Sequence, residues 1–250
     1  MKSAVSCGFQ QISKKRILLV SSLMSLVIMS VLVDSAVHTY RDGELLKKSF
    51  HIKILVDGIR SNTVHSFLPI LAVLPCSGIY VDDLKSRFDR FILIRSSCYT
   101  YIASRIIVAF LAGGLAILFG VLLAWGTIAA VLAPVEQVIE GVENVSTDEV
   151  FDLCILLFIN GGFWSITGMA LSSLMESKYI SYASPFVIYY LLVILYERYL
   201  PDAVLLYPLN WTNPDVWPFG ALGAVIFLLK LTTICGIVFI MRARKRMREL

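Results

Sequence analysis

Apolar residues gather in six long blocks along the chain, separated by shorter polar segments. A helix needs about 20 apolar residues to cross the roughly 30 Å hydrocarbon core of a bilayer, and these blocks reach or approach that length. The second block is the weakest, because Pro69 and Pro75 interrupt its helix. We therefore predict six membrane-spanning helices, at about residues 17–33, 64–81, 101–131, 151–175, 180–196 and 219–241.

Composition supports this interpretation. Of the 250 residues, 58% are hydrophobic and 16% are charged, against roughly 45–50% and about 25% in average proteins. The polar segments are too short for a separate soluble domain, which usually needs at least about 50 residues. The sequence thus predicts one all-α integral membrane domain over residues 1–250, and we expect no nucleic-acid partner.

The distribution of Lys and Arg predicts the orientation. Residues 2–16 and 242–248 are both basic, so the positive-inside rule places both termini in the cytoplasm and requires an even number of spans. Segment 134–152 then lies outside, and it carries six acidic residues with no Lys or Arg. Segment 34–62 is also placed outside, although its five Lys and Arg residues oppose that assignment.

Catalytic motifs are missing from the sequence. No Gly is followed by Lys, so a P-loop for nucleotide phosphates is excluded. The five cysteines show no C-x-x-C spacing and the three histidines no H-E-x-x-H spacing, which argues against a zinc site or a metalloprotease. We expect that the chain is not an enzyme and holds no cofactor or metal.

A charged segment lies between the second and third predicted spans, at residues 82–97. On a helical projection it has one apolar stripe, formed by Leu84, Phe88, Phe91 and Ile92, and a charged face with Asp83, Arg87 and Arg90. Burying an apolar side chain contributes about 1.5–3 kcal/mol, far more than the roughly 0.2–0.5 kcal/mol of an i,i+4 ion pair. Packing of the stripe therefore decides where this amphipathic helix lies, either on the lipid interface or in a groove of a soluble partner.

Several runs around this helix resemble the ABC-2-type transporter permeases, especially the short bacterial ones. These runs are LPILAVLP at 68–75, YVDD at 80–83, RFDRFILIRSS at 87–97, YIASR at 101–105 and GGL at 113–115. The chain differs from the family pattern in having Arg87-Phe88-Asp89 where a Gly-Phe pair is usual, and Arg105 where Lys is usual. Residues 68–115 carry the resemblance, and the six-span plan extends it loosely over the rest.

The resemblance implies a permease subunit of an ATP-driven exporter in a bacterial plasma membrane. In that family the cytoplasmic helix between spans two and three is the coupling helix, which contacts a separate ABC ATPase subunit that binds ATP and Mg. The subunit would also pair with a second permease copy or a paralogous permease. By position, the ATPase-contacting residues are Asp83, Leu84, Arg87, Phe88, Arg90, Phe91, Ile92 and Arg95.

The resemblance implies a second, shorter coupling loop between spans four and five, at Glu176, Ser177 and Lys178. An ordinary turn between two helices is the alternative for so short a segment. On the third span, Ala112, Ala116, Gly120 and Ala124 recur every fourth residue, which permits close approach of another helix. We expect that approach within the subunit, with subunit dimerisation as the alternative.

Lys230 lies near the middle of the sixth predicted span, where a charge costs roughly 2.5–3.5 kcal/mol on insertion scales. We therefore expect Lys230 to face the bundle interior or a wet cavity. Two roles remain open: Lys230 has a structural partner, either Asn160 or a backbone carbonyl, or Lys230 lies in the translocation path together with Asn160. The sequence does not identify the transported substrate.

A different class of function also fits the sequence. The chain could be an ATP-independent polytopic membrane protein, either a secondary transporter or a structural or sensory subunit whose amphipathic helix rests on the lipid surface. An ABC ATPase gene beside its own would favour the exporter over this class.

Overall fold

The computed structural model describes residues 14–41, 50–86, 97–132, 134 and 147–248, and these form helices joined by short turns, without a strand. The long helices are α2 (Lys14–Arg41), α7 (Cys98–Leu132), α8 (Thr147–Met175), α9 (Lys178–Ile194) and α10 (Ala221–Arg248). Shorter ones are α3 (Phe50–Ile59), α4 (Asn62–Val73), α5 (Ile79–Lys85), the π-helical turn η1 (Leu195–Tyr199) and the 3₁₀ turns η2 (Val204–Leu206), η3 (Pro208–Thr212) and η4 (Pro214–Val216). The expected all-α class is confirmed.

Five of these helices, α2, α7, α8, α9 and α10, are long and apolar enough to cross a membrane. They coincide with five of the six predicted spans, so a multi-pass membrane protein is supported. The span predicted at 64–81 is not among the five, because it is divided into two shorter helices; Pro69 lies within α4 and does not interrupt it as expected. α4 ends at Val73, residues 74–78 form a turn, and α5 begins at Ile79. Pro75 explains the break, because it has no backbone N–H to continue the helix.

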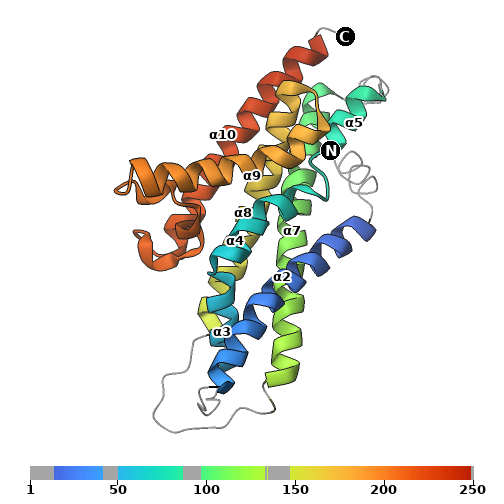
Figure 1. Cartoon of the computed structure of the whole chain (residues 1–250). Helices are drawn as coiled ribbons and strands as arrows, with labels where there is room; N and C mark the ends of the chain where they lie inside the picture. The colour runs from blue at the N-terminus through green and yellow to red at the C-terminus, as the bar shows by residue number, and fades with distance from the viewer. Residues whose placement is uncertain (1–13, 42–49, 87–96, 133, 135–146, 249–250) are drawn as a thin grey trace.

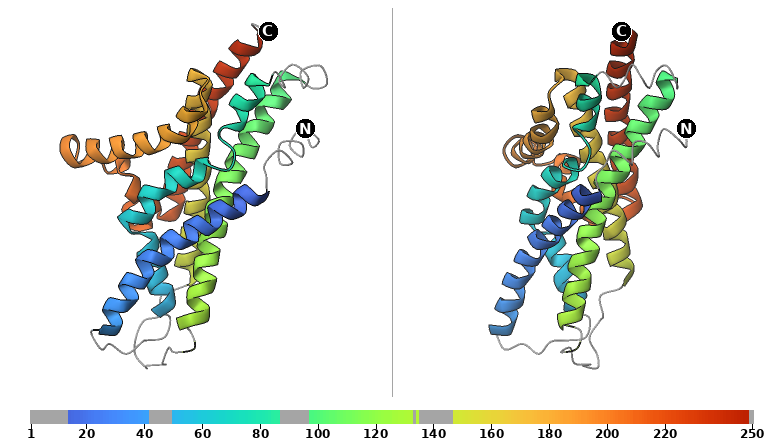
Figure 2. Two further views of the ribbon diagram at one scale, coloured as in Figure 1. Left: turned by 45° about the vertical axis from the view of Figure 1, so that its right-hand side comes forward. Right: turned by 90° about the vertical axis from the view of Figure 1, so that its right-hand side faces the viewer.

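α8 lies at the centre of the bundle and packs against α7, α9, α10 and α4, as Figures 1 and 2 show. Within the apolar 18-residue stretch of α8, 72% of the residues are buried. α7 packs along both α8 and α2. α8 and α7 therefore form the rigid core to which the other helices attach.

The small-residue stripe on α7 permits these close approaches. Ala112, Ala116 and Ala124 are fully buried, and a Cβ atom built on Gly120 would lie 2.6 Å from the Met24 Cβ of α2. Ser21 of α2 also donates a hydrogen bond of 3.0 Å to the Ala116 carbonyl. The expectation that this stripe packs within the subunit is confirmed.

The segment between α9 and α10 folds back onto the bundle rather than extending away from it. Trp211 is buried and stacks on Trp164 of α8, with ring centroids 5.8 Å apart. Thr212 and the buried His65 of α4 share a hydrogen bond of 2.6 Å between Oγ1 and Nε2. The aromatic residues of this segment thus anchor it against α4 and α8.

The basic segment 34–62, whose charge opposed the predicted orientation, contacts the acidic segment 134–152. Arg60, in the turn between α3 and α4, forms a 2.9 Å ion pair with Glu149 at the start of α8. Two segments that were predicted to lie on the same side of the membrane therefore meet in the fold. The acid compensates one of the five positive charges that opposed the predicted orientation.

Candidate functional site

The end of the bundle that carries the C-terminus gathers charged side chains from four elements, which we call the polar end. Its members come from α5, the first turns of α7, the α8–α9 turn and the last turns of α10, and Figure 1 shows these elements together. The residues are Asp82, Asp83, Tyr101, Arg105, Glu176, Lys178 and Arg246.

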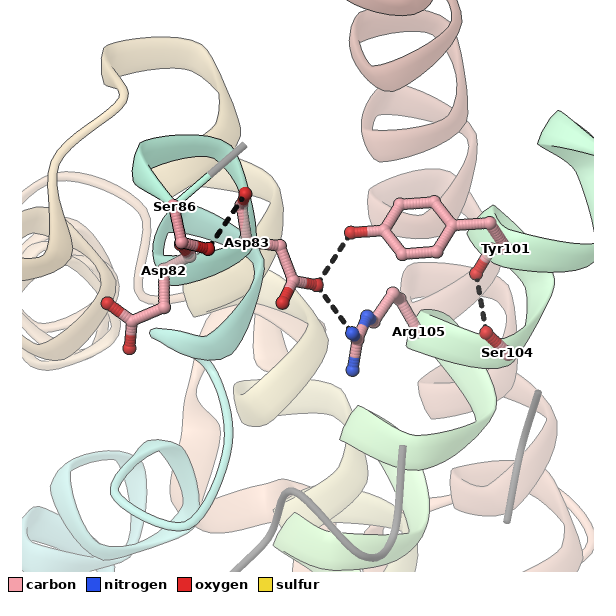
Figure 3. A network of polar contacts seen from close by, with 6 residues as sticks. All are labelled: Asp82, Asp83, Ser86, Tyr101, Ser104 and Arg105. Carbon is pink, nitrogen blue, oxygen red and sulfur yellow. Dashed lines mark hydrogen bonds and ion pairs between the residues drawn. The ribbon is translucent and has the colours of Figure 1, made fainter. Parts of the chain in front are cut away.

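Asp83 lies at the centre of a buried network that joins α5 to α7 (Figure 3). Its Oδ2 atom is 2.5 Å from Arg105 Nη2 and accepts a 2.7 Å hydrogen bond from the Tyr101 hydroxyl. Tyr101 and Arg105 are four residues apart on α7, so their side chains project from the same face of the helix. One carboxylate thus holds α5 against two consecutive turns of α7.

Both members of this ion pair are withdrawn from solvent. Asp83 is 4% exposed and Arg105 is 5% exposed. Burial raises the pKa of the Asp83 carboxyl, and the adjacent Arg105 guanidinium and Tyr101 hydroxyl oppose that rise. Arg105 stays charged at any relevant pH, and removing one partner of a buried pair typically costs about 3–5 kcal/mol. Loss of either partner alone should therefore cost much more than loss of one partner of a surface pair.

Two further ion pairs connect the α8–α9 turn to the polar end. Lys178 pairs with Asp82 of α5, and Glu176 forms a 3.1 Å pair with Arg246 of α10. These side chains are roughly 40% exposed or more, so each pair contributes at most about 1 kcal/mol. Such pairs position the turn but exchange partners at little cost.

The structure brings the two predicted coupling segments together. Lys178 of the second segment reaches Asp82, one residue before the start of the first segment at Asp83. Glu176 adopts a positive φ of 52°, which allows the chain to reverse sharply between α8 and α9. Ser177 precedes α9 as its N-cap residue.

Only the start of the first predicted coupling helix can be placed. Asp83 does not lie on an exposed charged face as expected, because its carboxylate turns inward to Arg105. Leu84 is half-buried and packs against the apolar cluster near Tyr101. The other predicted contacts, Arg87, Phe88, Arg90, Phe91, Ile92 and Arg95, lie outside the described residues, and contact of this helix with an ATPase stays a prediction.

The expectation for Lys230 is wrong. Its side chain is exposed on the outer side of α10, whereas α10 turns Ala224, Leu228 and Thr232 toward the bundle. Asn160 of α8 is fully buried, and its Oδ1 atom has no hydrogen-bond partner in the described part of the chain. The two residues therefore do not pair.

The contacts between the residues of the polar end were not predicted from the sequence. Tyr101 and Arg105 carried part of the family resemblance, but their contact with Asp83 was not foreseen. Tyr and Arg four residues apart, following an Asp across a polar segment, were the available signal. The contacts of Asp82 and Arg246 join residues 96 and 70 positions apart, and such distant pairs leave no local pattern in the sequence.

A cavity of about 770 Å³ lies apart from the polar end, between α7, α8 and α10. Its walls include Phe110, Trp125, Cys154, Phe158 and Leu229, and none of its lining residues is charged. Its lining is apolar apart from the Cys154 thiol, so the cavity suits hydrocarbon.

Comparison of the chain with protein-family models, curated proteins and solved structures finds no match.

Proposed function

We propose that this chain is the transmembrane permease subunit of an ATP-driven ABC-2-type exporter in a bacterial plasma membrane. Both termini lie in the cytoplasm, and separate ABC ATPase subunits bind ATP and Mg and dock on the polar end. The observation that carries the proposal is that the two segments assigned to ATPase contact by resemblance adjoin in space. They are bridged by the Lys178–Asp82 pair.

The geometry suits the transmission of force from an ATPase. Displacement of α5 pulls on α7 through the contacts of Asp83 with Arg105 and Tyr101. The same displacement reaches the start of α9 through Lys178. Since α7 and α9 both pack on the central α8, ATPase closure would shift these helices together and convert the permease between inward-open and outward-open states.

The test is a charge reversal on the predicted coupling helix. Arg87→Glu with Arg90→Glu should abolish co-purification of the ATPase subunit and stimulation of its ATP hydrolysis by the permease. The matched control is Lys53→Glu with Arg198→Glu, which makes the same charge change on exposed residues of α3 and η1, away from the polar end, and should preserve both. Equal binding and stimulation by the Arg87 and Arg90 double variant would overturn the proposal.

A further inference from the structure

Lys230 is the one charged residue within an otherwise apolar strip on the outer side of α10, among the described residues. Ile226, Ile234, Ile237 and Met241 share this side and are each more than half exposed. The residues that α10 buries lie on the opposite side, at Ala224, Leu228 and Thr232. Lys230 therefore projects from the fold where a membrane protein of one chain would contact lipid tails.

Lys230 lies too far from either end of the apolar part of α10 for its ammonium group to reach water readily. It follows Ala221 by nine residues and precedes Arg242 by twelve, so it lies about 14 Å from one end and about 18 Å from the other at 1.5 Å per residue. These distances place it near the middle of a hydrocarbon core roughly 30 Å thick. Charges at that depth are rare and normally pair inside a protein. No described residue forms an ion pair with the Lys230 ammonium.

Most of the surface of α9 is not covered by other parts of the described chain. Only 17% of its span is buried, compared with 28–72% of the other four candidate spans, and it projects from the bundle in Figures 1 and 2. A shallow apolar groove runs along it, lined by Phe186, Tyr190, Leu191, Ile194 and neighbouring residues. Glu197 follows this groove two residues after Leu195, is exposed, and forms no ion pair within the described chain.

We infer that the outer face of α10 docks on the α9 groove of a second copy of this chain, where Lys230 pairs with Glu197 of the partner subunit. The two surfaces are complementary in that each is apolar and carries an exposed charge of opposite sign, Lys230 on α10 and Glu197 after α9, although Arg198 beside Glu197 is exposed as well. Both helices pack on α8, and a two-fold axis would form the contact twice, as in most homodimers. Contact between the two α10 helices is disfavoured, since it would oppose two ammonium groups.

This interface concerns a surface away from the polar end, and it does not depend on the ATPase contact proposed above. The direct test is disulfide cross-linking in membranes that contain two differently tagged copies, each with the five native cysteines replaced. Lys230→Cys in one copy and Glu197→Cys in the other should cross-link upon mild oxidation. The control, Lys245→Cys with Glu197→Cys, should not. Cross-linking of neither pair, or of both pairs equally, would overturn the inference.

A charge exchange tests the ion pair itself. Lys230→Glu should weaken self-association of the purified protein in detergent at least about tenfold, because coupling energies of close interfacial charge pairs exceed one decade of affinity. Lys230→Glu with Glu197→Lys should restore it. Unchanged association of the single variant, or no recovery in the double variant, would contradict the pairing. Thermal unfolding of each variant in the same detergent verifies that the protomer itself still folds.

Discussion

Replacing Arg105 with Met would isolate the energetic role of the buried network that joins α5 to α7. The guanidinium is 5% exposed and lies 2.5 Å from the Asp83 carboxylate. Met keeps much of the apolar volume but leaves that carboxylate without its counter-charge. We expect the free energy of unfolding to fall by about 3–5 kcal/mol, which for a chain of this size lowers Tm by roughly 6–20 °C.

The pH dependence of the Arg105→Met variant has a definite sign. Arg105 normally opposes the rise that burial causes in the pKa of Asp83, so removing it raises that pKa further. A buried acid with a raised pKa binds more protons in the folded state than in the unfolded state. The variant should therefore lose stability as the pH rises from the ordinary Asp pKa through the higher folded value. Its deficit relative to the unsubstituted protein should be smaller at pH 5 than at pH 8.

The assay is thermal unfolding of the purified protein in one detergent across that pH range, with Asp83→Leu and the Arg105→Met/Asp83→Leu pair alongside. Replacing both partners of a buried ion pair with apolar residues is often neutral or stabilising, so the double variant should recover most of the lost stability. If Arg105→Met were as stable as the unsubstituted protein at pH 8, or if the losses of the two single variants simply added in the double variant, Arg105 and Asp83 would not be coupled and the network would not hold α5 on α7.

Three further predictions test the packing and the polar end. Gly113→Ala should destabilise by about 1–3 kcal/mol, because its new Cβ would lie 2.6–2.7 Å from atoms of α8; Gly126→Ala, with open space around it, should be neutral or slightly stabilising in the same unfolding assay. Thr212→Val should leave the buried His65 imidazole without its 2.6 Å partner and cost about 1–3 kcal/mol, seen as faster protease cleavage of the α9–α10 segment; unchanged cleavage would refute this anchoring. Lys178→Glu should change unfolding free energy by no more than about 1 kcal/mol, as befits an exposed pair, yet reduce stimulation of the ATPase subunit, and full stimulation would remove Lys178 from the coupling path.

The long helices could be predicted from the sequence because each membrane span is a continuous run of apolar residues. The same principle gave the small-residue stripe on α7, where Ala116 and Gly120 pack closely as expected. Pro75 predicted a break in the helix before α5. It did not predict where α5 begins, because a proline disrupts a helix without specifying the start of the next one. Local pattern thus determines most of the helices and few of their ends.

The polar end could be predicted only in part, because its contacts join distant segments. The resemblance to ABC-2-type permeases pointed to the segments at Asp83 and at Lys178, but not to the contacts that join them. The prediction that Lys230 faces the interior of the bundle was wrong for a different reason. Its cost in lipid is a sound argument that it needs a partner, yet that argument does not say whether the partner belongs to the same chain.

The most direct test of the account is whether an ATPase subunit covers the polar end. Ser86 is exposed at the end of α5, so Ser86→Cys in a chain without native cysteines can be labelled with a membrane-impermeant maleimide. The account predicts rapid labelling in inside-out vesicles, little labelling from the outside of intact cells, and protection when the ABC ATPase subunit is bound. Labelling from outside intact cells, or equal labelling with and without the bound ATPase subunit, would contradict it.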